Sequence, residues 1–104
     1  MPNRVDPARF TEKTFTRRKT FADSVNDYVA VIDGLEVARF LKKTMPNHEI
    51  KWSWSIFFMG LPAHLQPNNG LEDSLEQAQD TMKEKFWIWQ HFALERIAEG
   101  KWHL

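Results

Sequence analysis

The chain contains no cysteine. It therefore has no disulfide, no thiolate metal ligand and no thiol nucleophile, so its stability has to come from packing. It also lacks an apolar run near the ~18 residues needed to cross a bilayer. Its first residues, Met1 to Asp6, have none of the apolar stretch of a secretory signal. From these absences we expect a cytoplasmic protein.

Motifs for catalysis and for cofactors are missing as well. The chain has only four glycines, no G-x-G-x-x-G or G-x-x-x-x-G-K-[ST] phosphate loop, and no serine in a G-x-S-x-G context. His91 and Glu95 are four residues apart, which predicts a solvated pair on a helix. None of the four histidines has a metal-ligand spacing: His48, His64, His91 and His103. These absences predict a non-enzymatic protein with no catalytic residues, no metal site and no cofactor.

The chain carries no net charge, because 14 Lys and Arg residues balance 14 Asp and Glu residues. The two signs are unevenly distributed, since residues 1–26 hold six basic side chains against three acidic ones, and residues 71–104 hold four against seven. Either the basic N-terminal segment lies across the acidic C-terminal helix of its own chain, or it is an arm for an acidic partner. We favour the first interpretation, since a neutral protein exerts little long-range attraction on a polyanion.

Hydrophobic residues make up 42% of the chain and aromatic residues 13%, which indicates a folded globular protein. A chain of 104 residues is enough for one core. Residues 1–14 are polar and contain Pro2 and Pro7, so we expect a flexible N-terminal segment there. One α+β domain is expected over residues 15–100, followed by a C-terminal tail over residues 101–104.

The clearest strand signal lies in residues 50–59. Its even positions are large and apolar: Ile50, Trp52, Trp54, Ile56 and Phe58. The odd positions begin with a lysine and two serines, so the alternation has the period of a strand with one buried face. Large aromatics on such a face normally supply packing area. We therefore interpret the two tryptophans as core residues under a helix.

Two further β-rich runs, residues 27–32 and 35–41, are separated by Asp33-Gly34, which favours a type I′ hairpin turn. That turn predicts cross-strand pairs Ile32 with Leu35, Ala30 with Val37, and Tyr28 with Arg39. Neither face of this hairpin is clearly polar, so both are expected to be partly covered. Residues 15–21 alternate cationic and aromatic side chains and favour an edge strand.

Residues 60–73 have the composition of a surface loop, with Pro62, Pro67 and Asn68-Asn69-Gly70. A helix is expected from about 75 to 98, because Ser74 and Gln77 form a capping box and Gly100 provides a stop. Its core face repeats at helical spacing: Leu75, Ala78, Met82, Phe86, Trp89, Ala93 and Ile97. The complete pattern predicts a three- to four-stranded antiparallel sheet, a β-meander, packed against one long C-terminal helix.

A second apolar stripe lies about a quarter turn from this core face, at Trp87 and Leu94. Either Phe10, Phe15 and Phe21 of the N-terminal segment cover it, or a second protomer does.

Several short motifs carry a resemblance. They are D-Y-V at 27–29, D-G at 33–34, V-A-R at 37–39, W-S-W-S at 52–55, N-G at 69–70 and D-S-L-E-Q-A at 73–78. Over residues 15–90 the chain resembles small uncharacterised bacterial proteins with a D-[YW]-x-V…D-G hairpin, a W-x-W-S strand and a G-x-x-D-[ST]-x-x-x-A helix start. That family has no assigned activity, so the resemblance implies no site.

The arrangement of three antiparallel strands followed by a helix is also similar to that of integrase-type DNA-binding domains, which read the major groove with an exposed sheet face. Here that face would carry Lys51, Ser53 and Ser55, with either Arg39 or Glu36 depending on how the hairpin is oriented. Fold analogy is a weak argument for function.

Three functional hypotheses follow. The leading one is a small interaction module that binds itself as a homodimer, or another protein, through Trp87 and Leu94. The alternative is a nucleic-acid or acidic-partner surface formed by cations of the 15–21 strand and the sheet face: Arg17, Arg18, Lys19, Arg39 and Lys51. The third is a small-molecule pocket under the 60–73 loop. No membrane partner is expected.

Overall fold

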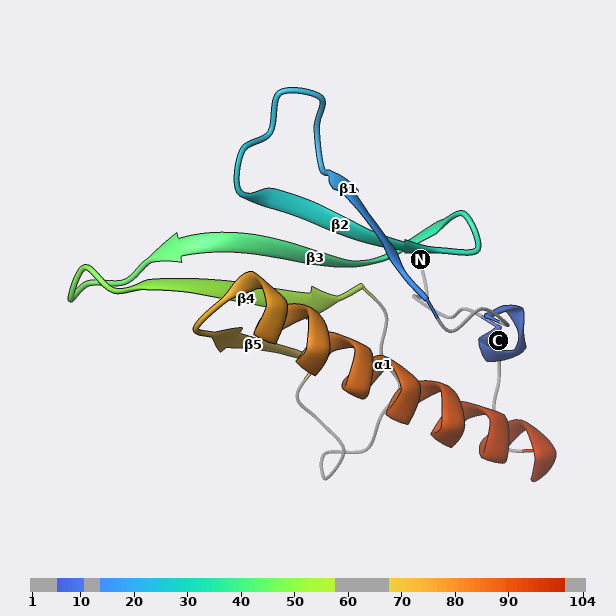
Figure 1. The fold of residues 1–104 in the computed structure, drawn as a ribbon. Helices are drawn as coiled ribbons and strands as arrows, with labels where there is room; N and C mark the ends of the chain where they lie inside the picture. Colours follow the sequence, from blue (N-terminus) through green and yellow to red (C-terminus); the bar gives the residue numbers. More distant parts are fainter. Residues whose placement is uncertain (1–5, 11–13, 58–67, 101–104) are drawn as a thin grey trace.

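A computed structural model describes residues 6–10, 14–57 and 68–100 of the chain. Five antiparallel strands follow one another in sheet order: β1 (Thr16–Lys19), β2 (Asp27–Ile32), β3 (Leu35–Thr44), β4 (Ile50–Ile56) and β5 (Asn69–Glu72). One long helix, α1 (Leu75–Ala98), lies across one face of this open meander (Figure 1). We call the face against α1 the inner face and the opposite one the outer face. The predicted α+β class is confirmed, with one strand more than the largest number expected.

The β2–β3 hairpin has the predicted turn but not the predicted register. Asp33 and Gly34 have φ of 50° and 75°, as a type I′ turn requires, and Ile32 pairs with Leu35. Beyond Val31–Glu36 a β-bulge shifts the register, so that Ala30 pairs with Ala38 and Tyr28 with Phe40. The predicted pairs of Ala30 with Val37 and of Tyr28 with Arg39 are therefore wrong.

The bulge has a physical reason in the sequence of β3. Val37 and Ala38 are consecutive and both are fully buried, whereas strict alternation would turn one of them towards the outer face. An extra residue in one strand resolves this conflict. Because of it, Glu36, opposite Val31, and Arg39, opposite Val29, both lie on the outer face. From the sequence, only one of these two residues was expected on the exposed face of the sheet; in the structure both lie there.

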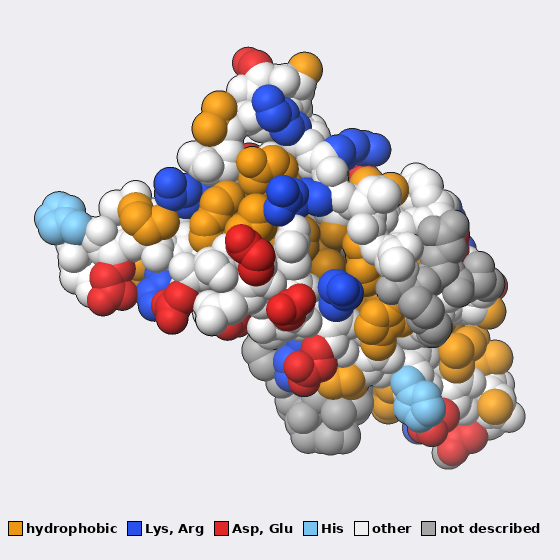
Figure 2. Space-filling view, in the orientation of Figure 1, with side chains coloured by type: hydrophobic (Ala, Val, Ile, Leu, Met, Phe, Trp, Pro, Cys, Tyr) orange, Lys and Arg blue, Asp and Glu red, His pale blue; other side chains and the backbone are white. Residues whose placement is uncertain are grey.

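Strand β4 supplies the core with Trp54 and Ile56, which are 2% and 4% exposed. Trp52 is half-buried and stacks on Tyr28, with ring centroids 6.1 Å apart. Ile50 is 45% exposed, because the end of the β3–β4 hairpin extends past the start of α1 (Figure 1). Figure 2 shows hydrophobic side chains at the surface over this part of the sheet, with basic and acidic side chains around them. The predicted buried position Phe58 lies outside the described residues.

Residues 69–72, expected in a loop, form β5 and pair with β4. Gly70 lies opposite Trp54, and a Cβ at this position would be 2.9 Å from the indole Nε1. The indole also donates a hydrogen bond of 3.2 Å to Oε2 of Glu72. Glycine is typical of turns, but here Gly70 lies within a strand and leaves space for the side chain of Trp54. Residues 60–67 of the expected loop lie outside the described residues.

Helix α1 begins and ends as the sequence predicts. The Ser74 hydroxyl accepts a hydrogen bond of 3.1 Å from the Gln77 amide, and Gln77 Oε1 accepts one of 3.1 Å from the Asp73 amide. Gly100, just after the helix, has φ of 73°. The buried positions are Ala78, Met82, Phe86, Trp89, Gln90 and Ala93. Ile97, expected on the core face, is 39% exposed.

Residues 6–10, which belong to the segment expected to be flexible, pack against α1. A short 3₁₀ helix, η1 (Pro7–Arg9), lies against the half of α1 that extends past the sheet (Figure 1). Phe10 is 1% exposed, and its ring centroid is 5.1 Å from that of Phe86. Gln90 Nε2 donates hydrogen bonds to the carbonyl oxygens of Pro7 and Phe10, at 2.9 and 2.7 Å. We call residues 6–10 the N-terminal strap; residues 1–5 and 11–13 lie outside the described part of the chain.

The second apolar stripe of α1 is covered in part by its own chain. The rings of Phe15 and Trp87 are 5.6 Å apart. Phe21 is 63% exposed on the β1–β2 connection, and Leu94 is 38% exposed. Of the two residues in the stripe, Trp87 is therefore covered by the N-terminal segment, whereas Leu94 stays at the surface.

Candidate functional site on the outer face of the sheet

The five cations predicted as a binding surface do not lie together. Side chains alternate between the faces of a strand, so Arg17 and Lys19, opposite Ala30 and Tyr28, are on the inner side of β1. The other three are on the outer face: Arg18, Arg39 and Lys51. Each of these three forms an ion pair with a carboxylate of its own chain, namely Glu36, Asp27 and Asp73.

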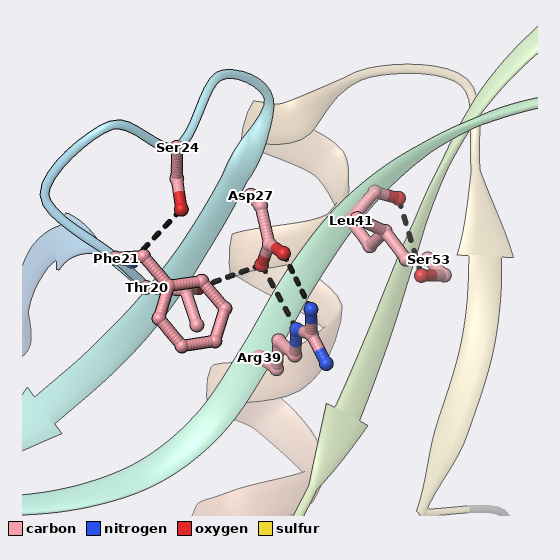
Figure 3. Close-up of polar contacts among 7 residues, drawn as sticks. All are labelled: Thr20, Phe21, Ser24, Asp27, Arg39, Leu41 and Ser53. Carbon is pink, nitrogen blue, oxygen red and sulfur yellow. Dashed lines mark hydrogen bonds and ion pairs between the residues drawn. The ribbon is translucent and has the colours of Figure 1, made fainter.

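The pair of Asp27 and Arg39 is the least exposed of these (Figure 3). Arg39 Nε donates to Asp27 Oδ1 at 2.9 Å, its Nη2 binds Oδ2, and the Thr20 hydroxyl donates to Oδ1 at 2.6 Å. The Asp27 side chain is only 14% exposed. The hydrogen bonds from Arg39 hold the pKa of Asp27 below its usual value of 3.8; burial opposes them and the Thr20 hydroxyl assists.

This ion pair anchors the β1–β2 connection, which Figure 3 shows beside it. The Thr20 amide donates to the Asp27 carbonyl oxygen at 3.1 Å. Within the connection, the Phe21 amide donates to the Ser24 hydroxyl at 2.8 Å, and the Ser24 amide donates to the Phe21 carbonyl oxygen at 2.9 Å. Two large apolar side chains are thus held in the solvent on a fixed turn, Phe21 at 63% and Val25 at 76% exposure.

We expect Asp27→Asn to lower the free energy of unfolding by about 1 kcal/mol at pH 7, the value of a partly exposed charge-assisted pair. Because folding lowers the pKa of Asp27, its contribution is complete above the unfolded value of 3.8 and is lost as the pH falls through the folded value. The difference between wild type and variant should therefore shrink below pH 3.8. Urea denaturation at pH 7, 4 and 3 measures it.

Asp23→Asn, in the same connection and exposed, is the matched control and should change little at any of these pH values. A difference for Asp27→Asn that stays constant down to pH 3 would show that the charge of Asp27 does not stabilise the fold.

Beside this pair the outer face has an open groove of about 640 Å³ across β3, β4 and β5. Its side chains combine two cations, two hydroxyls, an amide and two leucines: Arg39, Lys43, Ser53, Ser55, Asn69, Leu41 and Leu71. The Ser53 hydroxyl donates to the Leu41 carbonyl oxygen at 3.1 Å (Figure 3). Lys43 takes part in none of the ion pairs formed by the described residues. Leu71 is 46% exposed.

Sequence reasoning missed most of this groove. Leu41 and Lys43 lie two and four positions after Arg39 and share its face, so strand periodicity could have found them. Asn69 and Leu71 were assigned to a loop, and no sequence signal places them beside Ser55 and Ser53, their partners in the β4–β5 register.

The arrangement weakens the case for nucleic acid as the ligand. The cations on the outer face are mostly neutralised by their own chain, which leaves few to replace phosphate counterions. The two aromatics of the 15–21 stretch are also separated from those cations. Phe15 packs against Phe86 with ring centroids 5.3 Å apart, and Phe21 lies on the turn.

Residues 6–10, 14–57 and 68–100 hold no group of three His, Cys, Asp or Glu side chains placed to bind a metal ion. His91 Nε2 and Glu95 Oε1 are 3.0 Å apart, and both side chains are exposed, which confirms the expected solvated pair. No helix in these ranges is both long and apolar enough to span a membrane.

Comparison of the chain with family models, curated proteins and solved structures finds no match.

Proposed function

We propose that this protein is a non-enzymatic interaction module that binds another protein, or a second copy of itself, through the outer face of its sheet. The observation that carries the proposal is the groove of about 640 Å³ across β3, β4 and β5. No helix or strand among the described residues packs over it, because α1 and η1 both lie elsewhere.

The chemistry of the face is that of a protein-binding surface. Leu41 and Leu71 supply apolar area in the middle of polar groups, and protein interfaces have such an apolar centre with a polar rim. Phe21 on the anchored turn supplies an exposed aromatic side chain, a type that is enriched in protein interfaces. The strands and the Asp27–Arg39 pair fix these groups before binding, which reduces the entropy lost on association.

The proposal moves the interaction surface away from the stripe of Trp87 and Leu94. Trp87 is in contact with Phe15 of its own chain, so of the two residues in that stripe only Leu94 is exposed. Leu71, on the outer face, is more exposed than Leu94 and lies next to a groove.

A photo-crosslinking residue at Ser55 tests the proposal in cells that naturally make the protein. We expect a saturable crosslink to one protein from this position, and none from the same residue at Glu84, which is exposed on α1. Leu71→Glu should weaken the crosslink about tenfold, since a side chain central to an interface contributes about 1–2 kcal/mol. Ile97→Glu, at a similar exposure on α1, should leave it unchanged.

Sedimentation of the purified protein shows whether the partner is a second copy, in which case Leu71→Glu should dissociate a dimer. Equal crosslinking from Ser55 and Glu84 would refute the proposal. A product linked to DNA or RNA at Ser55 would assign the face to nucleic acid instead.

A further inference from the structure

A second recess lies on the opposite side of the sheet, between β1 and α1. It has a volume of about 120 Å³. Its floor is formed by Ala30, Phe40 and Met82, each about 1% exposed, with Phe15 at one side. A cavity of ~150 Å³ with apolar walls holds one benzene molecule. The recess is smaller than this and opens to the solvent, so it accepts part of one compact apolar group.

The mouth of this recess carries an arginine that is held by two neutral groups. Arg17 Nη1 donates to Gln79 Oε1 at 2.9 Å, and its guanidinium carbon lies 4.8 Å from the centroid of the Tyr28 ring. Both partners are neutral. Within the described residues Arg17 forms no ion pair, whereas its neighbour Arg18, on the other face of β1, is paired with Glu36. A neutral hydrogen bond and a ring hold the guanidinium in place and leave its positive charge available.

The other charged groups at the mouth are Lys83 and Asp80. Neither belongs to an ion pair of the described residues. Two cations and one carboxylate give the mouth a net positive charge. A positive mouth over an apolar floor is complementary to a small molecule with an anionic head and an apolar body.

We propose that this recess binds a small monocarboxylate that carries a single ring or a short branched chain. The apolar group would lie against Phe15, above the buried floor, and the carboxylate would accept hydrogen bonds from Arg17. The fork of a guanidinium matches the two oxygens of a carboxylate. Gln79 can keep its oxygen on Arg17 and offer its amide N–H groups to the same carboxylate. The site is independent of the outer face, so either can exist without the other.

Titration of the ¹⁵N-labelled protein with benzoate tests this site. We expect saturable shifts of the Arg17, Ala30 and Met82 amide resonances with a dissociation constant in the millimolar range, as for a ligand of this size. Benzamide, which has the same shape but no charge, should bind about tenfold more weakly, the value of one charge-assisted hydrogen bond. Acetate, which lacks the apolar body, should give no saturable shift at the same concentrations.

Matched variants on one strand separate the charge of the site from its shape. Arg17→Gln should weaken benzoate binding about tenfold and leave benzamide binding unchanged, because only the carboxylate interaction is removed. Arg18→Gln, one residue away on the opposite face, should leave both unchanged. Ala30→Val adds volume to the floor and should weaken both ligands; circular dichroism verifies that this variant is folded.

The proposal is overturned if benzoate shifts only resonances of the outer face, or causes no saturable shift. Equal weakening by Arg17→Gln and Arg18→Gln would overturn it as well, since that result would reflect net charge.

Discussion

Replacing Phe10 by alanine should lower the free energy of unfolding by about 3–5 kcal/mol, the cost of removing a large buried aromatic side chain. The side chain is 1% exposed, and its ring packs edge-on against Phe86 and Trp89, at centroid distances of 5.1 and 6.0 Å. Its loss would also release the two carbonyl oxygens that Gln90 binds, and leave the buried amide of Gln90 without them. The total free energy of unfolding of a small domain is about 5–15 kcal/mol. The variant should therefore be close to unfolding at 37 °C.

Guanidinium denaturation followed by tryptophan fluorescence measures this loss. Phe21→Ala is the matched control, because it removes the same side chain from a position that is 63% exposed. It should change the free energy of unfolding by less than about 0.5 kcal/mol. Similar values for both variants would mean that the N-terminal strap is not docked on α1 in solution.

Gly70→Val should lower the free energy of unfolding by about 2–3 kcal/mol, a typical cost of overpacking. Even the first added carbon would lie 2.9 Å from Trp54 Nε1 and 3.2 Å from Cε2. The indole cannot move aside easily, because it is 2% exposed and bound to Glu72. The strand β5 would have to separate from β4, which is its only partner in the sheet.

Thermal unfolding measures the loss of stability, and the near-ultraviolet circular dichroism of the tryptophans measures the change around Trp54. Asn69→Val, the neighbouring exposed position of β5, is the control and should change stability little, since valine is favoured in strands. A stable Gly70→Val protein with the same tryptophan spectrum as wild type would show that Gly70 and Trp54 are not in contact.

Features that depend on neighbouring residues alone were predictable from the sequence. The limits of α1 follow from Ser74, Gln77 and Gly100, which act within one turn of the helix end. The tight turn at Asp33-Gly34 follows from the ability of those residues to adopt positive φ. The class of the fold then follows, because strands with an apolar face need a partner layer.

Features that depend on distant residues were not predictable. Gly70 belongs to a strand because Trp54 requires an empty position opposite it. Phe10 is buried because α1 extends past the sheet and exposes apolar side chains there. The register of β3 changes at Val37 because the core takes two consecutive residues. No local propensity contains this information.

The charge of the candidate site also depends on residues that are distant in the sequence. Sequence periodicity placed cations on β1, β3 and β4 but could not show which carboxylates would reach them. The ion pairs Arg18–Glu36 and Lys51–Asp73 join residues 18 and 22 positions apart. They neutralise two cations of the outer face, whereas Arg17, on the inner side, has no ion pair with any described residue.

The N-terminal strap has a consequence for the order in which the protein is built. Gln90 binds the strap across 80 and 83 positions of the chain. During synthesis the strap leaves the ribosome before its binding surface on α1. The meander can pair strand by strand as the chain lengthens, because each strand contacts the one made just before it. Phe10 cannot be buried before Phe86 and Trp89 have been made, so the strap docks after the five strands of the meander have left the ribosome.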